Sequence, residues 1–119
     1  MESLTTPVER NVRLSEHLEC DLRIKRDDSY PAYGGGNKAR KIRYIVEGAV
    51  NAGYDAIVTN GGVQSNHARA TALICAENKI KCSLILHSEH AAKPSLCGNL
   101  LLMNMAGVSP LFCKLSDLS

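Results

Sequence analysis

The sequence predicts an α/β fold in which helices cross over between the strands of a parallel sheet. Short apolar runs alternate with amphipathic segments in units of about 25 to 30 residues, as in right-handed crossovers. The 119 residues are 45% hydrophobic and 22% charged, which is typical of an ordinary globular domain. Ligands of such sheets bind where strands run into helix N-termini, so those loops are the expected location of a site.

The N-terminal part is predicted to hold a short strand, an irregular loop and a helix. Residues 22–26 alternate polar and apolar side chains with the period of a strand. Residues 27–37 combine a proline, paired acids and three successive glycines, which predicts a loop. From Lys38 onward apolar residues recur with helical spacing, and Gly53 suits a C-terminal cap, so a helix is expected over 38–52.

The remaining elements alternate strand and helix. Residues 55–59 form a short apolar run of the kind that is buried on both faces of a sheet. In order, we expect a strand at 55–59, a helix from about 66 to 76, a strand at 80–87, a polar loop through 93–94, a helix at 96–106 and a strand at 107–113.

Charge and composition exclude several classes of partner. The net charge of +2 is too balanced for a nucleic-acid binder, and no apolar stretch is long enough to span a membrane. The N-terminus carries an acid where a signal peptide carries basic charge, so a cytoplasmic protein is expected. Five cysteines without a Cys-x-x-Cys pair indicate reduced, mostly buried thiols. His87 and His90 have no third ligand nearby in the sequence, so no metal site is expected.

The turn after the 55–59 strand is a candidate anion site. Gly61 and Gly62 would leave backbone N–H groups facing a carboxylate or phosphate at a helix N-terminus. Ser65 and Asn66 add a hydroxyl and an amide at the same mouth, although either could instead be a plain N-cap. The spacing is neither the three-glycine dinucleotide fingerprint nor a phosphate loop ending in Gly-Lys-Ser/Thr, which disfavours a mononucleotide-binding domain.

A lysine marks the second candidate site. Lys38 stands where the glycine-rich loop enters the helix, although the helix macrodipole disfavours a cation there. In a functional role this amine would form a Schiff base with a carbonyl cofactor. The alternative is an ordinary solvated lysine. For His67 the alternative to a functional role is a half-buried histidine held by a hydrogen bond.

Three motifs, in this order, resemble a known family. Residues 25–28 (Lys-Arg-Asp-Asp), 35–41 (Gly-Gly-Asn-Lys-Ala-Arg-Lys) and 61–69 (Gly-Gly-Val-Gln-Ser-Asn-His-Ala-Arg) are similar to those of the pyridoxal-phosphate enzymes comprising 1-aminocyclopropane-1-carboxylate deaminase and D-cysteine desulfhydrase. The resemblance implies a fold-type II, tryptophan synthase beta-like architecture. Residues 1–53 would then begin the larger cofactor-binding domain, and residues 54–119 would form most of the smaller α/β domain.

The same resemblance implies roles for individual residues. Lys38 would hold pyridoxal 5'-phosphate covalently through its amine, and Lys41 would help to bind the cofactor phosphate. Asn66 would hydrogen-bond the hydroxyl oxygen of the pyridine ring. Ser65 would contact the substrate and assist proton transfer at its α-carbon. The residues expected to bind the substrate are Gly62, Gln64, Ser65, Asn66 and His67.

The implied reaction is a pyridoxal-phosphate-dependent lyase reaction on a small amino acid. His67 stands where deaminases of the group tend to carry glutamine, which favours β-elimination from D-cysteine to pyruvate, ammonia and sulfide. A deaminase acting on 1-aminocyclopropane-1-carboxylate and a non-catalytic α/β fragment are the alternatives. Family members are more than twice as long, so we expect a truncated chain that lacks their C-terminal half. Weak cofactor binding, doubtful activity, exposed apolar surface and self-association would follow, with a homo-oligomer or the missing half as partner.

Overall fold

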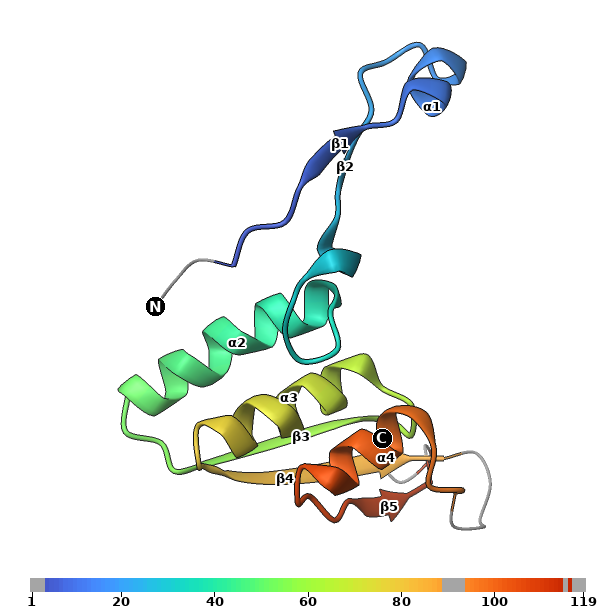
Figure 1. Cartoon of the computed structure of the whole chain (residues 1–119). Coiled ribbons are helices and arrows are strands. Elements are labelled where there is room, and N and C mark those ends of the chain that lie inside the picture. Colours follow the sequence, from blue (N-terminus) through green and yellow to red (C-terminus); the bar gives the residue numbers. More distant parts are fainter. Residues whose placement is uncertain (1–3, 89–93, 115, 117–119) are drawn as a thin grey trace.

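The computed structural model describes residues 4–88, 94–114 and 116, and shows an α/β body with an N-terminal arm (Figure 1). The Cα radius of gyration is 17.2 Å. A compact chain of this length would measure about 13.5 Å. The arm accounts for the elongation, because it projects away from the body while the helices and the main sheet pack together.

The arm is a two-stranded antiparallel ribbon with a short helix at its tip. β1 (Val8–Arg10) pairs with β2 (Arg23–Lys25), and α1 (Val12–His17) lies between them in the chain. The side chain of Asn11 caps α1 by accepting a hydrogen bond from the backbone N–H of Leu14 at 3.0 Å. The strand predicted at 22–26 is confirmed. β1 and α1 were not predicted, because elements this short carry too few residues to display a period.

The predicted lysine-bearing helix is confirmed as α2 (Gly36–Asn51). It follows a single turn of 3-10 helix, η1 (Asp27–Ser29), which lies in the segment predicted as a loop. The buried stripe of α2 consists of Ala39, Ile42 and Val46, at the spacing that keeps side chains on one face of a helix.

The body contains a three-stranded sheet of β3 (Ala56–Gly62), β4 (Lys81–His87) and β5 (Leu111–Cys113) in the order β3-β4-β5. Both strand pairs are parallel, which confirms the predicted parallel sheet with crossover helices. The crossovers are α3 (Asn66–Glu77) and α4 (Gly98–Met105). β3 runs past the predicted 55–59 as far as Gly62, because its last residues pair with the end of β4.

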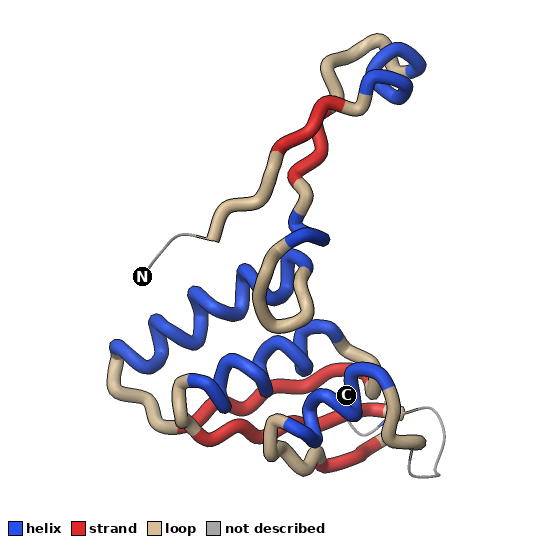
Figure 2. Tube along the Cα trace, viewed as in Figure 1, coloured by secondary structure: helices blue, strands red, loops and turns tan. Residues whose placement is uncertain are grey.

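α3 and α4 lie on one side of the sheet, and α2 forms a further layer over α3 (Figure 2). α3 lies between the sheet and α2, so it is buried on two sides. One cluster joins α3 to the sheet and α4 through Ala68, Ala72, Leu84, Leu86, Leu100, Met103 and Val108. A second cluster joins α3 to α2 through Ile42, Val46, Ala70, Ile74 and Cys75. α2 belongs to the first predicted domain and α3 to the second, and the two helices pack closely on each other. The predicted domain division between residues 53 and 54 therefore stays a prediction.

Two expectations about burial are wrong. The strand at 55–59 is not buried on both faces, because the side chain of Val58 is 67% exposed on the face that no described helix covers. The cysteines are not mostly buried either. Cys75 is buried, whereas Cys20 and Cys97 are exposed. Val58 is exposed because the described helices cover the sheet from one side only. Cys20 lies on the arm and Cys97 at the start of α4, so neither residue belongs to the two buried clusters.

The C-terminal elements are shorter than predicted. α4 ends at Met105 and Gly107 follows with φ +81°, a left-handed conformation that terminates a helix and suits glycine. β5 then begins only after Pro110, which has no N–H to offer to the ladder. Part of the predicted polar loop falls at 89–93, outside the described residues.

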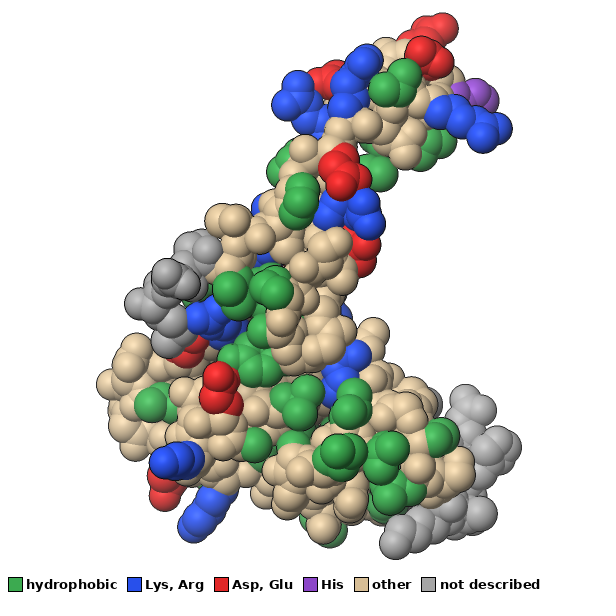
Figure 3. Space-filling model, viewed as in Figure 1, with side chains coloured by type: hydrophobic (Ala, Val, Ile, Leu, Met, Phe, Trp, Pro, Cys, Tyr) green, Lys and Arg blue, Asp and Glu red, His purple; other side chains and the backbone are tan. Residues whose placement is uncertain are grey.

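The surface over α4 is apolar. Leu101, Leu102 and Met105 are exposed on α4, and Leu111 is exposed on β5. Figure 3 shows apolar side chains gathered over this part of the body, whereas charged side chains are spread over the arm and other parts of the body. Among the described residues, no helix has both the length and the apolar character needed to cross a membrane.

Candidate functional site

The loop before α2 needs its glycines for steric reasons. Tyr33, Gly34, Gly35 and Gly36 all have positive φ, between 55° and 83°. Left-handed backbone over successive residues is accessible mainly to glycine. A Cβ on Gly35 would also stand 3.0 Å from the carbonyl oxygen of Asp28. The positive φ values and the close approach of Gly35 to Asp28 therefore restrict the backbone conformation of this loop. The loop leads directly into the first turn of α2, where Lys38 lies.

A tyrosine ties this loop to the far end of α3. The hydroxyl of Tyr33 donates a hydrogen bond to the carboxylate of Glu77. Burial, and then the hydrogen bond to Glu77, raise the pKa of Tyr33 to about 12. Tyr33 therefore stays a protonated donor at neutral pH, which keeps the loop against α3.

The turn between β3 and α3 is shaped by the cap of α3. Ser65 is the N-cap residue, and its Oγ accepts a hydrogen bond from the N–H of Ala68 at 3.2 Å. A Cβ on Gly61 would lie 2.7 Å from that Oγ, so the cap requires glycine at position 61. The N-cap alternative for Ser65 is confirmed as geometry. A hydroxyl that accepts one hydrogen bond still has a proton to donate, so its role toward a substrate stays a prediction.

His67 lies in the first turn of α3, half-buried and within the electrostatic influence of both predicted lysines. Burial lowers the pKa of His67 from 6.5, and the charges of Lys41 and Lys38 lower it further. The ring Nε2 of His67 lies 2.9 Å from the hydroxyl of Thr59. His67 thus has the hydrogen bond expected of a half-buried histidine, in a cleft between α2 and β3. Its role in substrate binding stays a prediction.

Arg69 joins the two loops of the candidate site. Its guanidinium donates to the side-chain oxygens of Asn66 and Asn99, each at 3.1 Å, and to the carbonyl oxygen of Gly35 at 3.2 Å. A Cβ on Gly34 would lie 3.0 Å from its Cζ, so the loop backbone lies directly against the guanidinium. Arg69 was not predicted as a site residue. The available signal was an arginine one turn into a helix of small apolar residues.

Gln64 is turned toward α4. Its Nε2 donates to the carbonyl of Cys97 at 3.1 Å, and its Oε1 accepts from the N–H of Asn99 at 2.8 Å. Gly62 lies in β3 opposite His87. The structure therefore places Gln64 as a support for the start of α4, and substrate contacts of Gln64 and Gly62 stay predictions.

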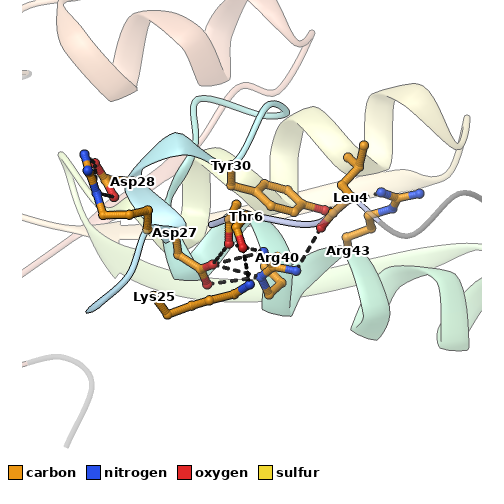
Figure 4. A network of polar contacts seen from close by, with 9 residues as sticks. Leu4, Thr6, Lys25, Asp27, Asp28, Tyr30, Arg40 and Arg43 are labelled. Atoms are coloured by element: carbon orange, nitrogen blue, oxygen red, sulfur yellow. Dashed lines mark hydrogen bonds and ion pairs between the residues drawn. The ribbon is translucent and has the colours of Figure 1, made fainter. Parts of the chain in front are cut away.

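Arg40 anchors the N-terminal segment to α2 (Figure 4). It donates to the carboxylate of Asp27 at 2.9 and 3.0 Å, to the hydroxyl of Thr6 at 2.9 Å and to the carbonyl of Leu4 at 3.0 Å. Its guanidinium also lies 4.7 Å from the centre of the Tyr30 ring. The hydrogen bond from Arg40, followed by that from Thr6, holds the pKa of Asp27 below its usual value. This network holds the first turns of α2 in place.

No metal centre is formed by the part of the chain that the structure describes, since no group of three or more His, Cys, Asp or Glu side chains is placed to hold an ion. His90, one of the two histidines considered in the sequence, lies outside the described residues.

The sequence profile described as "Pyridoxal-phosphate dependent enzyme" matches residues 2–116. The chain belongs to this family. Among curated members, a D-cysteine desulfhydrase of Yersinia pestis (strain Pestoides F) is 37% identical over 112 residues. The match covers 92% of this chain and 34% of that enzyme.

Solved structures of other proteins share the fold. A crystal structure titled as an ACC deaminase homologue matches with a TM-score of 0.76 and 33% identity, over 93% of this chain and 33% of that one. Threonine deaminase isoform 2 from Solanum lycopersicum matches with a TM-score of 0.64 and 18% identity, over 92% of this chain and 28% of that one, which shows the fold alone. The predicted fold-type II architecture is confirmed. This chain spans about a third of the length of the curated relatives it matches.

Proposed function

We propose that this chain forms the lysine-bearing part of a pyridoxal-phosphate-dependent amino-acid lyase of the D-cysteine desulfhydrase kind. The observation that carries the proposal is the joining of the Lys38 loop to the Ser65–Asn66 turn, because Arg69 bonds both. In this proposal residues 1–53 begin the larger domain and residues 54–119 supply most of the smaller one.

The residues present fit pyridoxal 5'-phosphate. Lys38, a half-buried residue, offers its amine for the aldehyde carbon, and Lys41 offers a second cation for the phosphate. The N-terminus of α2 has no side-chain cap, so its backbone N–H groups are also suited to an anion. Asn66 supplies an exposed amide for the ring hydroxyl oxygen.

When bound, the cofactor supplies an electron sink for bond cleavage at the α-carbon of an amino acid. The chain's own residues would bind and orient. Lys38 holds the cofactor covalently, and the backbone N–H groups of the β3–α3 turn hold the substrate carboxylate. Ser65, with a proton to donate, assists proton transfer at the α-carbon. With D-cysteine as substrate, β-elimination and hydrolysis give sulfide, pyruvate and ammonia.

A deaminase acting on 1-aminocyclopropane-1-carboxylate is the second candidate. The match to the ACC deaminase homologue favours it, and His67 in place of glutamine favours the desulfhydrase. Sulfide release from D-cysteine, measured against ammonia release from aminocyclopropane carboxylate, decides between them. Release of neither product would favour a non-catalytic fragment.

The proposal extends to partners and location. Because the relatives are about three times as long as the matched region, the active assembly would need the remaining part of the family fold or a homo-oligomer. The net charge of +2 does not suit a nucleic-acid partner. Five free cysteines suit the reducing cytoplasm.

The test is the visible absorption spectrum of the purified chain with added pyridoxal phosphate, before and after borohydride reduction. We expect a band that reduction fixes covalently in the wild type and in Lys79→Ala, which replaces an exposed lysine two residues after the end of α3, but not in Lys38→Ala. An equal band in Lys38→Ala, or none in the wild type, would overturn the proposal.

A further inference from the structure

The buried arginine of α3 sets the orientation of two amide side chains. A guanidinium has only donors, so any atom that it hydrogen-bonds must be an acceptor. The atoms of Asn66 and Asn99 that face Arg69 are therefore the oxygens, each at 3.1 Å. An asparagine without such a partner could present either end of its amide.

This orientation decides what Asn66 can offer a ligand. Its Oδ1 accepts from Arg69 and also from Nδ2 of Asn99, at 2.8 Å. In the described part of the chain no partner is recorded for the Nδ2 of Asn66, which lies on an exposed residue. Asn66 thus presents a hydrogen-bond donor, the group that a ring hydroxyl oxygen accepts from.

Arg69 carries its charge in an unusual setting. The residue is only 8% exposed, and its Nε is buried without a hydrogen-bond partner among the described residues. No carboxylate of the described part forms an ion pair with it, so all its acceptors are neutral oxygens. Burying a cation without a counter-charge is costly. Packing stability alone does not account for an arginine at this position.

We propose that Arg69 is the positioning residue of the site: it fixes the Asn66 amide with its NH₂ outward and ties the Lys38 loop to the start of α3. The first part of this inference, that Arg69 ties the Lys38 loop to α3 (the loop half), stands on the Gly35 contact alone. The second part, that the orientation of Asn66 acts on the bound cofactor (the cofactor half), rests on the proposed function. Arg69 acts through Asn66 and Gly35 and does not itself reach the reacting atoms.

The loop half is tested by amide hydrogen exchange, measured by NMR on the chain without cofactor. In Arg69→Met we expect exchange at the amides of Gly35 and Asn99 to rise by about tenfold to a hundredfold, as loss of a charged hydrogen bond implies. Arg69→Lys, which keeps the charge and some donors, restores part of the protection. Arg13→Met, on an exposed arginine of α1, serves as the control. Equal acceleration at the core amide of Leu86, or no acceleration at Gly35, would overturn the inference.

A second variant covers the case in which Arg69→Met does not fold. Asn99→Ala removes one partner of the guanidinium and leaves Arg69 in place. The structure records no hydrogen bond between Asn99 and Gly35, so faster exchange at Gly35 in this variant supports transmission through Arg69. Unchanged exchange at Gly35 counts against it.

The cofactor half is tested by the pH dependence of the visible absorption band that the chain forms with pyridoxal phosphate. Asn66→Asp keeps an acceptor for Arg69 and removes the NH₂ donor, so we expect the pH midpoint of the band to shift upward. Arg69→Lys should shift it in the same direction by a smaller amount, because a lysine ammonium holds the Asn66 amide less firmly than the planar fork of a guanidinium does. A shift in Asn66→Asp with none in Arg69→Lys overturns the inference. Absence of any band in the wild type overturns the proposed function, while the exchange experiment still decides the role of Arg69.

Discussion

Replacing Gly61 by alanine should destabilise the chain far more than the same change at its neighbour, Gly62. A Cβ on Gly61 would stand 2.7 Å from the Oγ and 2.9 Å from the Cβ of Ser65. A Cβ on Gly62 would meet only the Cε1 of His87, at 3.6 Å, which is an ordinary contact. The two glycines are adjacent in one strand, so they form a matched pair.

The magnitude follows from two losses. Displacing the Ser65 side chain breaks the N-cap of α3, which costs about 1 kcal/mol. Relieving the remaining overlap between Cβ atoms costs about 2 kcal/mol. Against this, replacing any glycine restricts the unfolded chain and stabilises by about 0.5 kcal/mol. We therefore expect Gly61→Ala to lower the free energy of unfolding by about 2.5 kcal/mol, and Gly62→Ala to raise it slightly.

Urea denaturation followed by circular dichroism measures both values. The double variant Gly61→Ala/Ser65→Gly removes the overlap and keeps a tolerated N-cap residue, so most of the loss should be recovered. If Gly61→Ala and Gly62→Ala agree within about 0.5 kcal/mol, the margin of ordinary surface substitutions, the cap does not depend on glycine at position 61. The same would follow if the double variant recovered nothing.

Three further predictions concern titration, reactivity and association. Folding lowers the pKa of His67 from 6.5, so the unfolded chain binds more protons than the folded chain as the pH falls below 6.5. Acid should therefore lower the free energy of unfolding of the wild type more than that of His67→Gln. Urea titrations between pH 7 and pH 5 measure this difference. In the native chain, an aromatic disulfide reagent should modify the exposed Cys20 and Cys97 quickly and the buried Cys75 only at the rate of unfolding; fast loss of Cys75 would contradict its burial. Light scattering should show self-association that Met105→Lys reduces, since Met105 is 74% exposed on the apolar surface of α4, and a monomer at high concentration would refute this.

Most of the fold was predictable because it depends on local periodicity. The apolar spacing from Lys38 onward, the runs at 55–59 and 80–87, and Gly53 as a stop signal all act within a few residues of chain. The arm was not predictable in the same way. Its ribbon is a pairing between residues such as Val8 and Lys25, which are far apart in the sequence, and α1 is too short to show a period.

In the candidate site, too, the residues marked by local signals were predictable and the contacts between distant segments were not. Lys38, Ser65 and Asn66 were predicted from motifs, because glycine-rich turns at helix starts are local signals. The arginines that hold these segments in place, Arg69 and Arg40, were not predicted to do so. Arg69 meets Gly35 and Asn99, and Arg40 meets Asp27 and the N-terminal segment, only after the helices have packed.

The order of residues along this chain thus specifies the helices α2, α3 and α4, most of its strands, and the loops that carry a lysine and a hydroxyl. Which face of the sheet is covered, and which ends of the Asn66 and Asn99 amides face inward, depend on contacts between distant segments. The physical reason is the distance along the chain over which each interaction acts. Backbone propensity and capping act over a few residues, whereas the hydrogen bonds of a buried guanidinium depend on the three-dimensional packing of α2, α3 and α4.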